Sequence, residues 1–214
     1  VSGTFFTPLE LVNDFTIEIC GNTIVDLCAG IGGLGFYYYH RNNHSGITPK
    51  ITCIEYNPEF VEVGKKIFPE ATWICGDICD EQLIKSLPRF KMAIGNPPFG
   101  KIKSNHSSNW MAYKGSEMEY KTIYVGSLIA NNGAFIIPQM SCPFIYSGSG
   151  GIKDQTSAKL EKFTKETEIE ITASCGIDTS YCENKWKGAS PTVEIVTIEY
   201  PEIKQPEIKQ LSLL

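Results

Sequence analysis

A glycine-rich turn followed by a carboxylate is the first feature of the sequence that could bind a ligand. The segment DLCAGIGGLG begins at Asp26, and within it Gly30, Gly32 and Gly35 have G-x-G-x-x-G spacing. Glu55 ends the next apolar run, at roughly the 20-residue distance where a carboxylate can bind ribose hydroxyls. Glycines let the backbone turn tightly and let a ligand approach it closely. Together these residues predict a nucleotide-binding turn between a strand and a helix.

The charge around this turn indicates which nucleotide it would take. Asp26 ends the first apolar run, where it would repel the pyrophosphate of a dinucleotide bound at the helix N-terminus. Asp77 ends the third apolar run and could accept a hydrogen bond from an adenine amino group. Because unpaired buried carboxylates are costly, a ligand with an ammonium and a sulfonium group suits these acids. The pattern favours S-adenosylmethionine (AdoMet) over NAD, although an NAD-dependent oxidoreductase would share the glycine spacing.

A second motif, Asn96-Pro97-Pro98-Phe99, follows the fourth apolar run. Neither proline has an N–H, so the turn is stiff and presents carbonyl acceptors without competing backbone donors. Asn96 adds a side-chain carbonyl, and Phe99 offers a face on which a planar base can stack. Two acceptors on the hydrogens of an adenine amine would localise a lone pair that is otherwise delocalised into the ring. Methyl transfer to that nitrogen then depends on positioning and charge complementarity more than on a strong base.

These motifs, in this order, resemble those of a known family. DLCAGIGG, Glu55, Gly76-Asp77 and the NPPF tetrapeptide are similar to the motifs of AdoMet-dependent amino-methyltransferases, and closely so to the adenine-N6 group. The opening GTFFTP, at residues 3–8, resembles that family's N-terminal cofactor-contacting segment. Its place ahead of the glycine turn is the motif order of the gamma-type N6-adenine DNA methyltransferases. The resemblance implies methyl transfer from AdoMet to adenine N6 in DNA, with S-adenosyl-L-homocysteine as the product.

The resemblance also implies a role for each matching residue. The implied cofactor-binding residues are Phe5, Phe6, Thr7 and Pro8 at the methionine end, Asp26, Cys28, Gly30 and Gly32 around the turn, Glu55 at the ribose, Tyr56, Asp77 and Ile78 at the adenine, and Asn96 beside the transferred methyl. The implied catalytic residues are Asn96 and the Pro97 carbonyl on the target amine, Pro98 in the stiff turn, and Phe99 stacked on the target base.

The order of apolar runs and helical patterns predicts an α/β fold. Strands are expected near 23–29, 50–56, 72–77, 91–96, 133–139, 169–175 and 192–200, and helices near 9–20, 32–42, 58–68, 80–87, 116–131 and 153–167. This alternation indicates a parallel doubly wound sheet, with the last two strands as an antiparallel pair at one edge. The resemblance implies the class I AdoMet-dependent methyltransferase (Rossmann-like) fold, a seven-stranded, mostly parallel sheet with an antiparallel last strand.

Three segments outside this alternation are candidates for nucleic-acid contact: 100–115, 141–151 and 178–190. Each follows or joins the C-terminal end of a strand, where open α/β sheets bind ligands. Residues that could touch a target base or its phosphates are Lys101, Lys103, Tyr181, Lys185 and Trp186. Members of the family usually supply a second aromatic from the loop before the last strand, for which Trp186 and Tyr181 are the candidates. The alternative is that the lysines are solvated charges and both aromatics pack in the core.

Length and composition set outer bounds on these interpretations. The 214 residues, 42% of them hydrophobic, suffice for one methyltransferase domain, expected over 1–200 with an extended tail over 201–214. The net charge of −5 excludes a wholly basic nucleic-acid coat but allows a local basic patch. We expect a cytoplasmic protein without signal peptide or membrane span, because no apolar stretch reaches ~18 residues. The eight cysteines lack metal-ligand spacing and predict reduced thiols and no metal site.

No separate target-recognition domain is evident, which leaves several readings of partner and substrate open. The enzyme could be compact with loose specificity, the chain could be a catalytic fragment, or a separate specificity subunit could supply recognition. DNA is the expected partner. RNA is the alternative, because RNA adenine-N6 methyltransferases carry the same tetrapeptide and a single strand needs no base flipping. A protein glutamine methyltransferase or a non-catalytic partner subunit fits the motifs less well.

Overall fold

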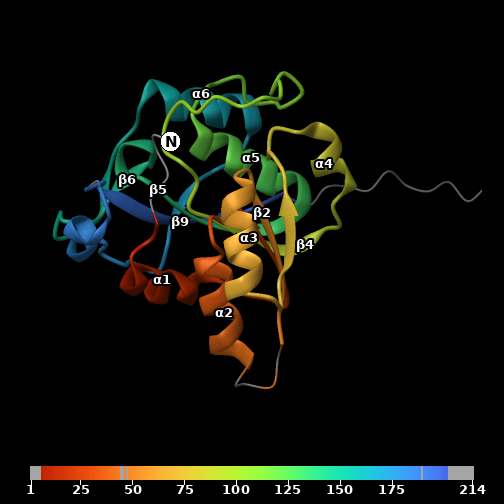
Figure 1. Cartoon of the computed structure of the whole chain (residues 1–214). Coiled ribbons are helices and arrows are strands. Elements are labelled where there is room, and N and C mark those ends of the chain that lie inside the picture. Colours follow the sequence, from red (N-terminus) through yellow and green to blue (C-terminus); the bar gives the residue numbers. More distant parts are fainter. Residues whose placement is uncertain (1–5, 44–45, 47, 189, 202–214) are drawn as a thin grey trace, which may run out of the picture.

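A seven-stranded sheet forms the centre of the protein (Figure 1). Its strand order is β3-β2-β1-β4-β5-β9-β8. The computed structural model of the chain describes residues 6–43, 46, 48–188 and 190–201. The predictions for Phe5 and for most of the tail, 202–214, lie outside these described residues. The strands of this sheet are β1 (Thr23–Leu27), β2 (Lys50–Glu55), β3 (Thr72–Cys75), β4 (Phe90–Gly95), β5 (Ala130–Pro138), β8 (Thr172–Ala173) and β9 (Val193–Glu199).

The direction of the strands confirms the predicted topology. β1 pairs in parallel with β2 and β4, and the parallel ladder continues through β3 on one side and β5 on the other. β9 is antiparallel to both of its neighbours, β5 and β8. The central strands are buried along nearly their whole length because helices cover both faces. The expected seven-stranded, mostly parallel sheet with an antiparallel last strand is therefore present.

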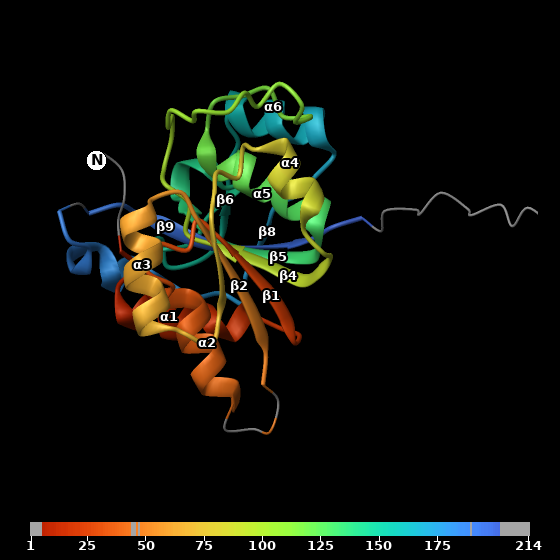
Figure 2. The ribbon, with the colours of Figure 1, turned by 45° about the vertical axis from the view of Figure 1, so that its right-hand side comes forward.

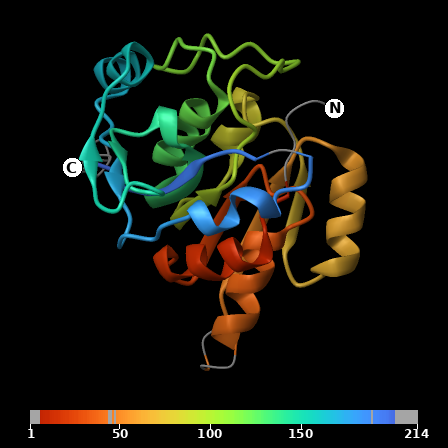
Figure 3. The ribbon, with the colours of Figure 1, turned by 90° about the vertical axis from the view of Figure 1, so that its left-hand side faces the viewer.

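In the described part of the chain, six helices cover the two faces of the sheet. They are α1 (Leu9–Phe15), α2 (Gly33–Asn43), α3 (Pro58–Ile67), α4 (Glu81–Ser86), α5 (Met118–Ile129) and α6 (Ala158–Thr167). α1 and α2 lie on one side of the sheet, and α4, α5 and α6 lie on the other (Figures 2 and 3). α1 and α2 contribute to one core cluster and α4, α5 and α6 to the other, so the sheet separates two apolar layers. Three of the helices begin after residue types that favour an N-cap. The side chains of Asn57, Asp80 and Ser157 each accept a backbone hydrogen bond there.

The largest differences from the sequence expectation lie in the second half of the chain. The helix expected from residue 153 begins at Ala158, because Lys153–Asp154 forms β7, which pairs with β6 (Phe144–Ile145) in a separate antiparallel hairpin. The strand expected over 169–175 is only two residues long. Residues 178–190 contain a short 3-10 helix, η3 (Ser180–Lys185). Two further 3-10 turns are η1 (Thr16–Glu18) and η2 (Gln139–Ser141).

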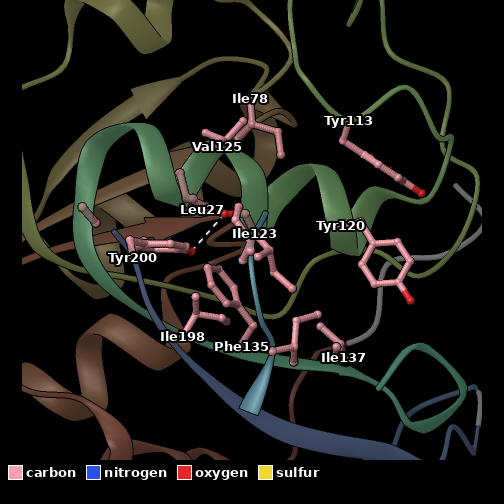
Figure 4. Packing of buried hydrophobic residues seen from close by; sticks show 14 of the residues in the cluster. Leu27, Ile78, Tyr113, Tyr120, Ile123, Val125, Phe135, Ile137, Ile198 and Tyr200 are labelled. Carbon is pink, nitrogen blue, oxygen red and sulfur yellow. Dashed lines mark hydrogen bonds between the residues drawn. The ribbon is translucent and has the colours of Figure 1, made fainter. Parts of the chain in front are cut away.

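Tyr200 joins the end of β9 to α5 within the larger core cluster (Figure 4). Its hydroxyl donates to the Ile123 carbonyl at 2.9 Å, beside the side chains of Phe135 and Ile198. A Cβ at Gly126 would lie 2.5 Å from that hydroxyl, so a glycine is required there. This packing fixes α5, whose N-terminus holds the segment after β4.

Among the described residues, no helix is long and apolar enough to cross a membrane. The eight cysteines are free, and their burial varies: four are buried, one is half-buried and three are exposed.

Candidate active site

A cavity of about 590 Å³ opens where the C-terminal ends of β1, β2, β3 and β4 meet. This is the edge at which parallel α/β sheets bind ligands. The predicted residues that line it are Phe6, Thr7, Cys28, Gly30, Glu55, Tyr56, Asp77, Ile78, Asn96, Pro97, Pro98, Phe99 and Lys103. Five segments that are distant in the sequence thus supply one cavity wall. The structure does not place Pro8, Asp26, Gly32, Lys101, Tyr181, Lys185 or Trp186 on that wall.

The glycine turn is built from left-handed residues. Cys28, Gly30 and Gly32 have φ values of 78°, 58° and 90°. A Cβ on Gly32 would lie 2.8 Å from the Trp73 ring, so the turn needs glycine for space as well as for conformation. The Gly30 amide donates to Glu55 Oε2 at 2.8 Å, which ties the turn to the end of β2. The predicted turn and its predicted carboxylate are therefore in direct contact.

Glu55 and Asp77 each keep a carboxylate at the cavity with part of its hydrogen-bonding capacity already used. Glu55 Oε1 accepts from the Asn57 amide at 2.8 Å, and burial raises the pKa of this carboxyl group. Asp77 Oδ1 accepts from the Cys79 amide at 2.8 Å, and its Oδ2 accepts from Ser104 Oγ at 2.6 Å. Each oxygen retains a second lone pair for a ligand hydroxyl or amine. Both carboxylates therefore keep acceptor capacity at the cavity, and the ribose and adenine contacts expected of them stay predictions.

Asn96 presents a buried acceptor at the cavity. Its Nδ2 donates to Thr7 Oγ1 at 2.9 Å, across 89 positions of sequence. Its Oδ1 is buried and has no hydrogen-bond partner. Because leaving a buried carbonyl unpaired costs about 1–3 kcal/mol, the arrangement favours a ligand that donates a hydrogen bond at this point.

The segment after the tetrapeptide is held by the N-terminus of α5. The Gly100 amide donates to Glu119 Oε2 at 2.9 Å, and the Met118 amide donates to the Gly100 carbonyl at 2.8 Å. Glu119 is itself buried and accepts from Ser141 Oγ at 2.8 Å. Proline rings on one side and these hydrogen bonds on the other restrain the backbone before and after Phe99.

Asp26 lies behind the glycine turn. Its side chain is completely buried, and neither carboxylate oxygen accepts a hydrogen bond. Burial raises the pKa of Asp26 to about 7, an effect that the nearby Gly35 amide opposes and Glu55 reinforces. Asp26 is therefore not part of the cavity wall.

The aromatics predicted in the 178–190 segment take structural positions. Trp186 is only 5% exposed and packs in the core with α1 and β9, so the packing alternative describes it. Tyr181 donates its hydroxyl to Asp14 of α1, and Lys185 Nζ lies 2.7 Å from Glu10 Oε1. These contacts fasten the segment to α1 instead of directing the three side chains at the cavity.

Sequence reasoning missed several lining residues. Phe60 and Met118 contribute apolar surface, Ser104 contributes a hydroxyl, and Lys187 contributes a cation. A signal for Lys187 existed, because it follows Trp186 in the same predicted loop. No signal for Phe60 or Met118 existed, since a helical aromatic or methionine is ordinarily a core residue.

No protein-family model and no curated protein matches the sequence. Solved structures do match. A type I restriction-modification methyltransferase subunit from Streptococcus thermophilus superposes with a TM-score of 0.61 at 14% identity, over 94% of this chain and 46% of that one. A putative class I S-adenosylmethionine-dependent methyltransferase from Listeria monocytogenes gives 0.59 at 13%, over 92% and 60%. A putative RNA methyltransferase from Pyrococcus horikoshii gives 0.56 at 15%, over 92% and 87%.

The fold is that of the class I AdoMet-dependent methyltransferases. At these identities the likeness establishes the fold alone. The chain spans less than two thirds of the Streptococcus and Listeria chains, and most of the Pyrococcus chain. The class I fold explains why the glycine turn, Glu55, Asp77 and the tetrapeptide share one cavity, since each follows a neighbouring parallel strand.

Proposed function

We propose that this protein is an AdoMet-dependent methyltransferase that modifies the exocyclic N6 of adenine in DNA. One observation carries the proposal. Asn96 lies on the wall of the cavity that also contains the glycine turn, and its buried Oδ1 has no hydrogen-bond partner. An acceptor in that state suits a ligand amine. Its position beside two prolines and Phe99 suits a planar, amine-bearing base.

The residues around the glycine turn fit the proposed cofactor. Glu55 has free lone pairs for ribose hydroxyls, and Asp77 has one for the adenine amine. The Asp26 carboxyl group is buried without a hydrogen-bond partner, and a ligand that carries positive charge, as AdoMet does at its ammonium and sulfonium groups, would favour its ionised form. When bound, AdoMet supplies a methyl group on a good leaving group. The solved class I structures with this fold include proteins described as S-adenosylmethionine-dependent, which supports the same choice.

The chemistry assigned to the chain itself is positioning. Asn96 Oδ1 and the Pro97 carbonyl accept the two hydrogens of the target amine, which directs the nitrogen lone pair toward the cofactor side. Thr7 holds the Asn96 amide by its Nδ2 and so keeps Oδ1 aimed at the amine. Phe99 stacks on the base and fixes its plane. Because positive charge develops on the nitrogen during transfer, two nearby acceptors lower the barrier without a strong base.

DNA and RNA are the two substrates with support. The N-terminal segment with Phe6 and Thr7 has the motif order of the DNA enzymes, and one structural neighbour is a restriction-modification subunit. A separate specificity subunit and a restriction-modification role would follow from that reading. RNA is the second candidate, because the putative RNA methyltransferase is matched over 87% of its length. Glutamine methylation and a non-catalytic role have no comparable observation in their favour.

The deciding experiment is methyl transfer from labelled AdoMet to duplex DNA and to structured RNA in parallel, followed by nucleoside mass spectrometry. We expect N6-methyldeoxyadenosine in the DNA. N6-methyladenosine in the RNA alone would replace the leading proposal by the second candidate. Cofactor binding with no product on either nucleic acid would reject methyl transfer by this chain alone.

Two variants separate the roles of the site residues. Asn96→Ala should lower turnover far more than cofactor affinity, because Asn96 contacts the target amine. Asp77→Ala should weaken cofactor binding in calorimetry. Loss of cofactor binding in Asn96→Ala, with turnover per bound cofactor preserved, would contradict the assignment of Asn96.

A further inference from the structure

Two exposed lysines from different segments line the cavity. Lys103 belongs to the segment after β4, and Lys187 follows η3 in the segment before β9. Both side chains are exposed, and they are the only cationic residues among the described residues of the lining. Within the described part of the chain, neither takes part in an ion pair. Two unpaired cations at one rim are notable in a protein whose net charge is −5.

Lys103 is positioned by hydrogen bonds on either side of it. The Gly100 amide donates to Glu119, and Ser104 Oγ donates to Asp77 Oδ2 at 2.6 Å. Next to Ser104, Asn105 Nδ2 donates to the Tyr56 hydroxyl at 2.6 Å. The backbone at Lys103 is therefore held beside the cavity even though its side chain extends into solvent.

Lys187 is positioned by the residues just before it. Trp186 is buried in the core, and Lys185 Nζ lies 2.7 Å from Glu10 Oε1 on α1. Trp186 and Lys185 are thus held by contacts away from the cavity, whereas Lys187, the next residue, lines it. Lys187 therefore lines the same cavity as Lys103 but comes from a different segment.

We infer that Lys103 and Lys187 bind the phosphates that flank the target nucleotide, so that the acceptor is a nucleotide within a strand. This inference rests on the proposed function and names the substrate feature that it requires. A base that reaches Asn96 and Phe99 must leave its phosphodiester backbone outside, at the rim. Phosphates carry the charge that two exposed lysines bind, whereas a glutamine side chain offers them nothing. The strand then crosses the opening between the two segments.

The test measures binding of a fluorescein-labelled single-stranded deoxyoligonucleotide of about 15 nucleotides by anisotropy, over a series of salt concentrations. S-adenosyl-L-homocysteine is present throughout. Lys103→Gln and Lys187→Gln should each weaken binding roughly three- to tenfold at low salt. Each should also reduce the slope of log K against log salt by about 0.7, the value for one phosphate contact on a single strand.

Lys50→Gln is the matched control. Lys50 is an exposed lysine at the N-terminal end of β2, whereas the cavity lies at the C-terminal end of that strand. Both the affinity and the salt slope should therefore be unchanged in Lys50→Gln. Unchanged slopes in Lys103→Gln and Lys187→Gln would overturn the inference. An equal loss in Lys50→Gln would do the same, since the binding would then reflect overall charge. If a glutamate-rich peptide bound as tightly, and Lys103→Gln and Lys187→Gln weakened its binding as much, the two lysines would be a site for an acidic protein and the inference would be wrong.

The outcomes separate this inference from the proposed function. Methylated adenine with unchanged slopes would retain the function and reject the lysine contacts. Reduced slopes without methyl transfer would retain the strand contact and reject the chemistry. Thermal melting verifies that each variant is folded, and calorimetry with S-adenosyl-L-homocysteine verifies that it binds the cofactor product. The melting temperature and the affinity are expected to match those of the unmodified protein.

Discussion

Ser104 donates its hydroxyl to the Asp77 carboxylate at 2.6 Å, which joins the segment after β4 to the end of β3. Ser104 also lines the cavity together with Ile102 and Lys103. A cofactor held by Asp77 would therefore touch the same segment that carries the rim lysine. Any ligand that contacts the segment in this position stabilises it there.

Ser104→Ala should loosen this segment. The substitution removes a hydrogen bond to a charged acceptor, which contributes about 1.5–3 kcal/mol, part of which supports the cavity wall. We expect S-adenosyl-L-homocysteine to bind roughly three- to tenfold more weakly in calorimetry, and amides of 100–110 to exchange faster. Ser107→Ala is the control, because Ser107 is exposed in the same segment and does not touch Asp77. Equal behaviour of the two variants would show that the Ser104 contact has no such role.

Thr7→Val should impair turnover by releasing the Asn96 amide. Valine keeps the shape of threonine but cannot accept from Asn96 Nδ2. The amide can then rotate, and Oδ1 no longer points at the target amine in every molecule. We expect kcat to fall about tenfold or more, by analogy with the loss of one positioned polar group, with a smaller change in cofactor affinity. Thr7→Ser retains the hydroxyl and should stay close to the unmodified enzyme; a kcat as low as that of Thr7→Val would contradict the argument.

Asp26→Asn should change how stability depends on pH. The pKa of Asp26 rises from 3.8 to about 7 on burial, so the folded protein holds a proton that the unfolded chain releases. The resulting stabilisation is present at low pH and is lost as pH rises through this window. Asparagine has no such charge, so the variant should gain stability over the unmodified protein between about pH 4 and about pH 7. The gain should reach ~1.4 kcal/mol per pH unit at its steepest. Urea unfolding across that range tests this, and parallel curves would show that Asp26 does not titrate as stated.

Gly64→Ala should destabilise the protein and disturb the glycine turn. A Cβ at this position would lie 2.1 Å from the Trp73 ring, and the same ring lies 2.8 Å from the Cβ position of Gly32. If the Trp73 ring moved to make room for the new methyl group at position 64, its packing against Gly32 in the glycine turn would change as well. Overpacking of this kind costs about 1–3 kcal/mol, and cofactor affinity should fall with it. Gly33→Ala, where nothing lies within 4 Å, should be neutral or slightly stabilising in thermal melts; a comparable loss there would remove the steric explanation.

Local sequence patterns were sufficient to predict the central parallel strands and the helices between them. Each of the first four apolar runs became a parallel strand, because an alternation of strands and helices has few ways to cover both faces of a sheet. Once the strands are parallel, their C-terminal ends share one edge. Glu55, Asp77 and Asn96 were therefore predictable as neighbours from their places after successive strands.

The tertiary structure decided the features that depend on distant contacts. Thr7 reaches Asn96 across 89 positions, and no local pattern encodes that hydrogen bond. Trp186 enters the core while Lys187 faces the cavity, an assignment that depends on which side of the segment α1 covers. The helix expected from residue 153 starts later because Lys153 pairs with a strand formed elsewhere. Periodicity reports which face of an element is buried, whereas the partner of a polar loop residue is set only when the whole chain has packed.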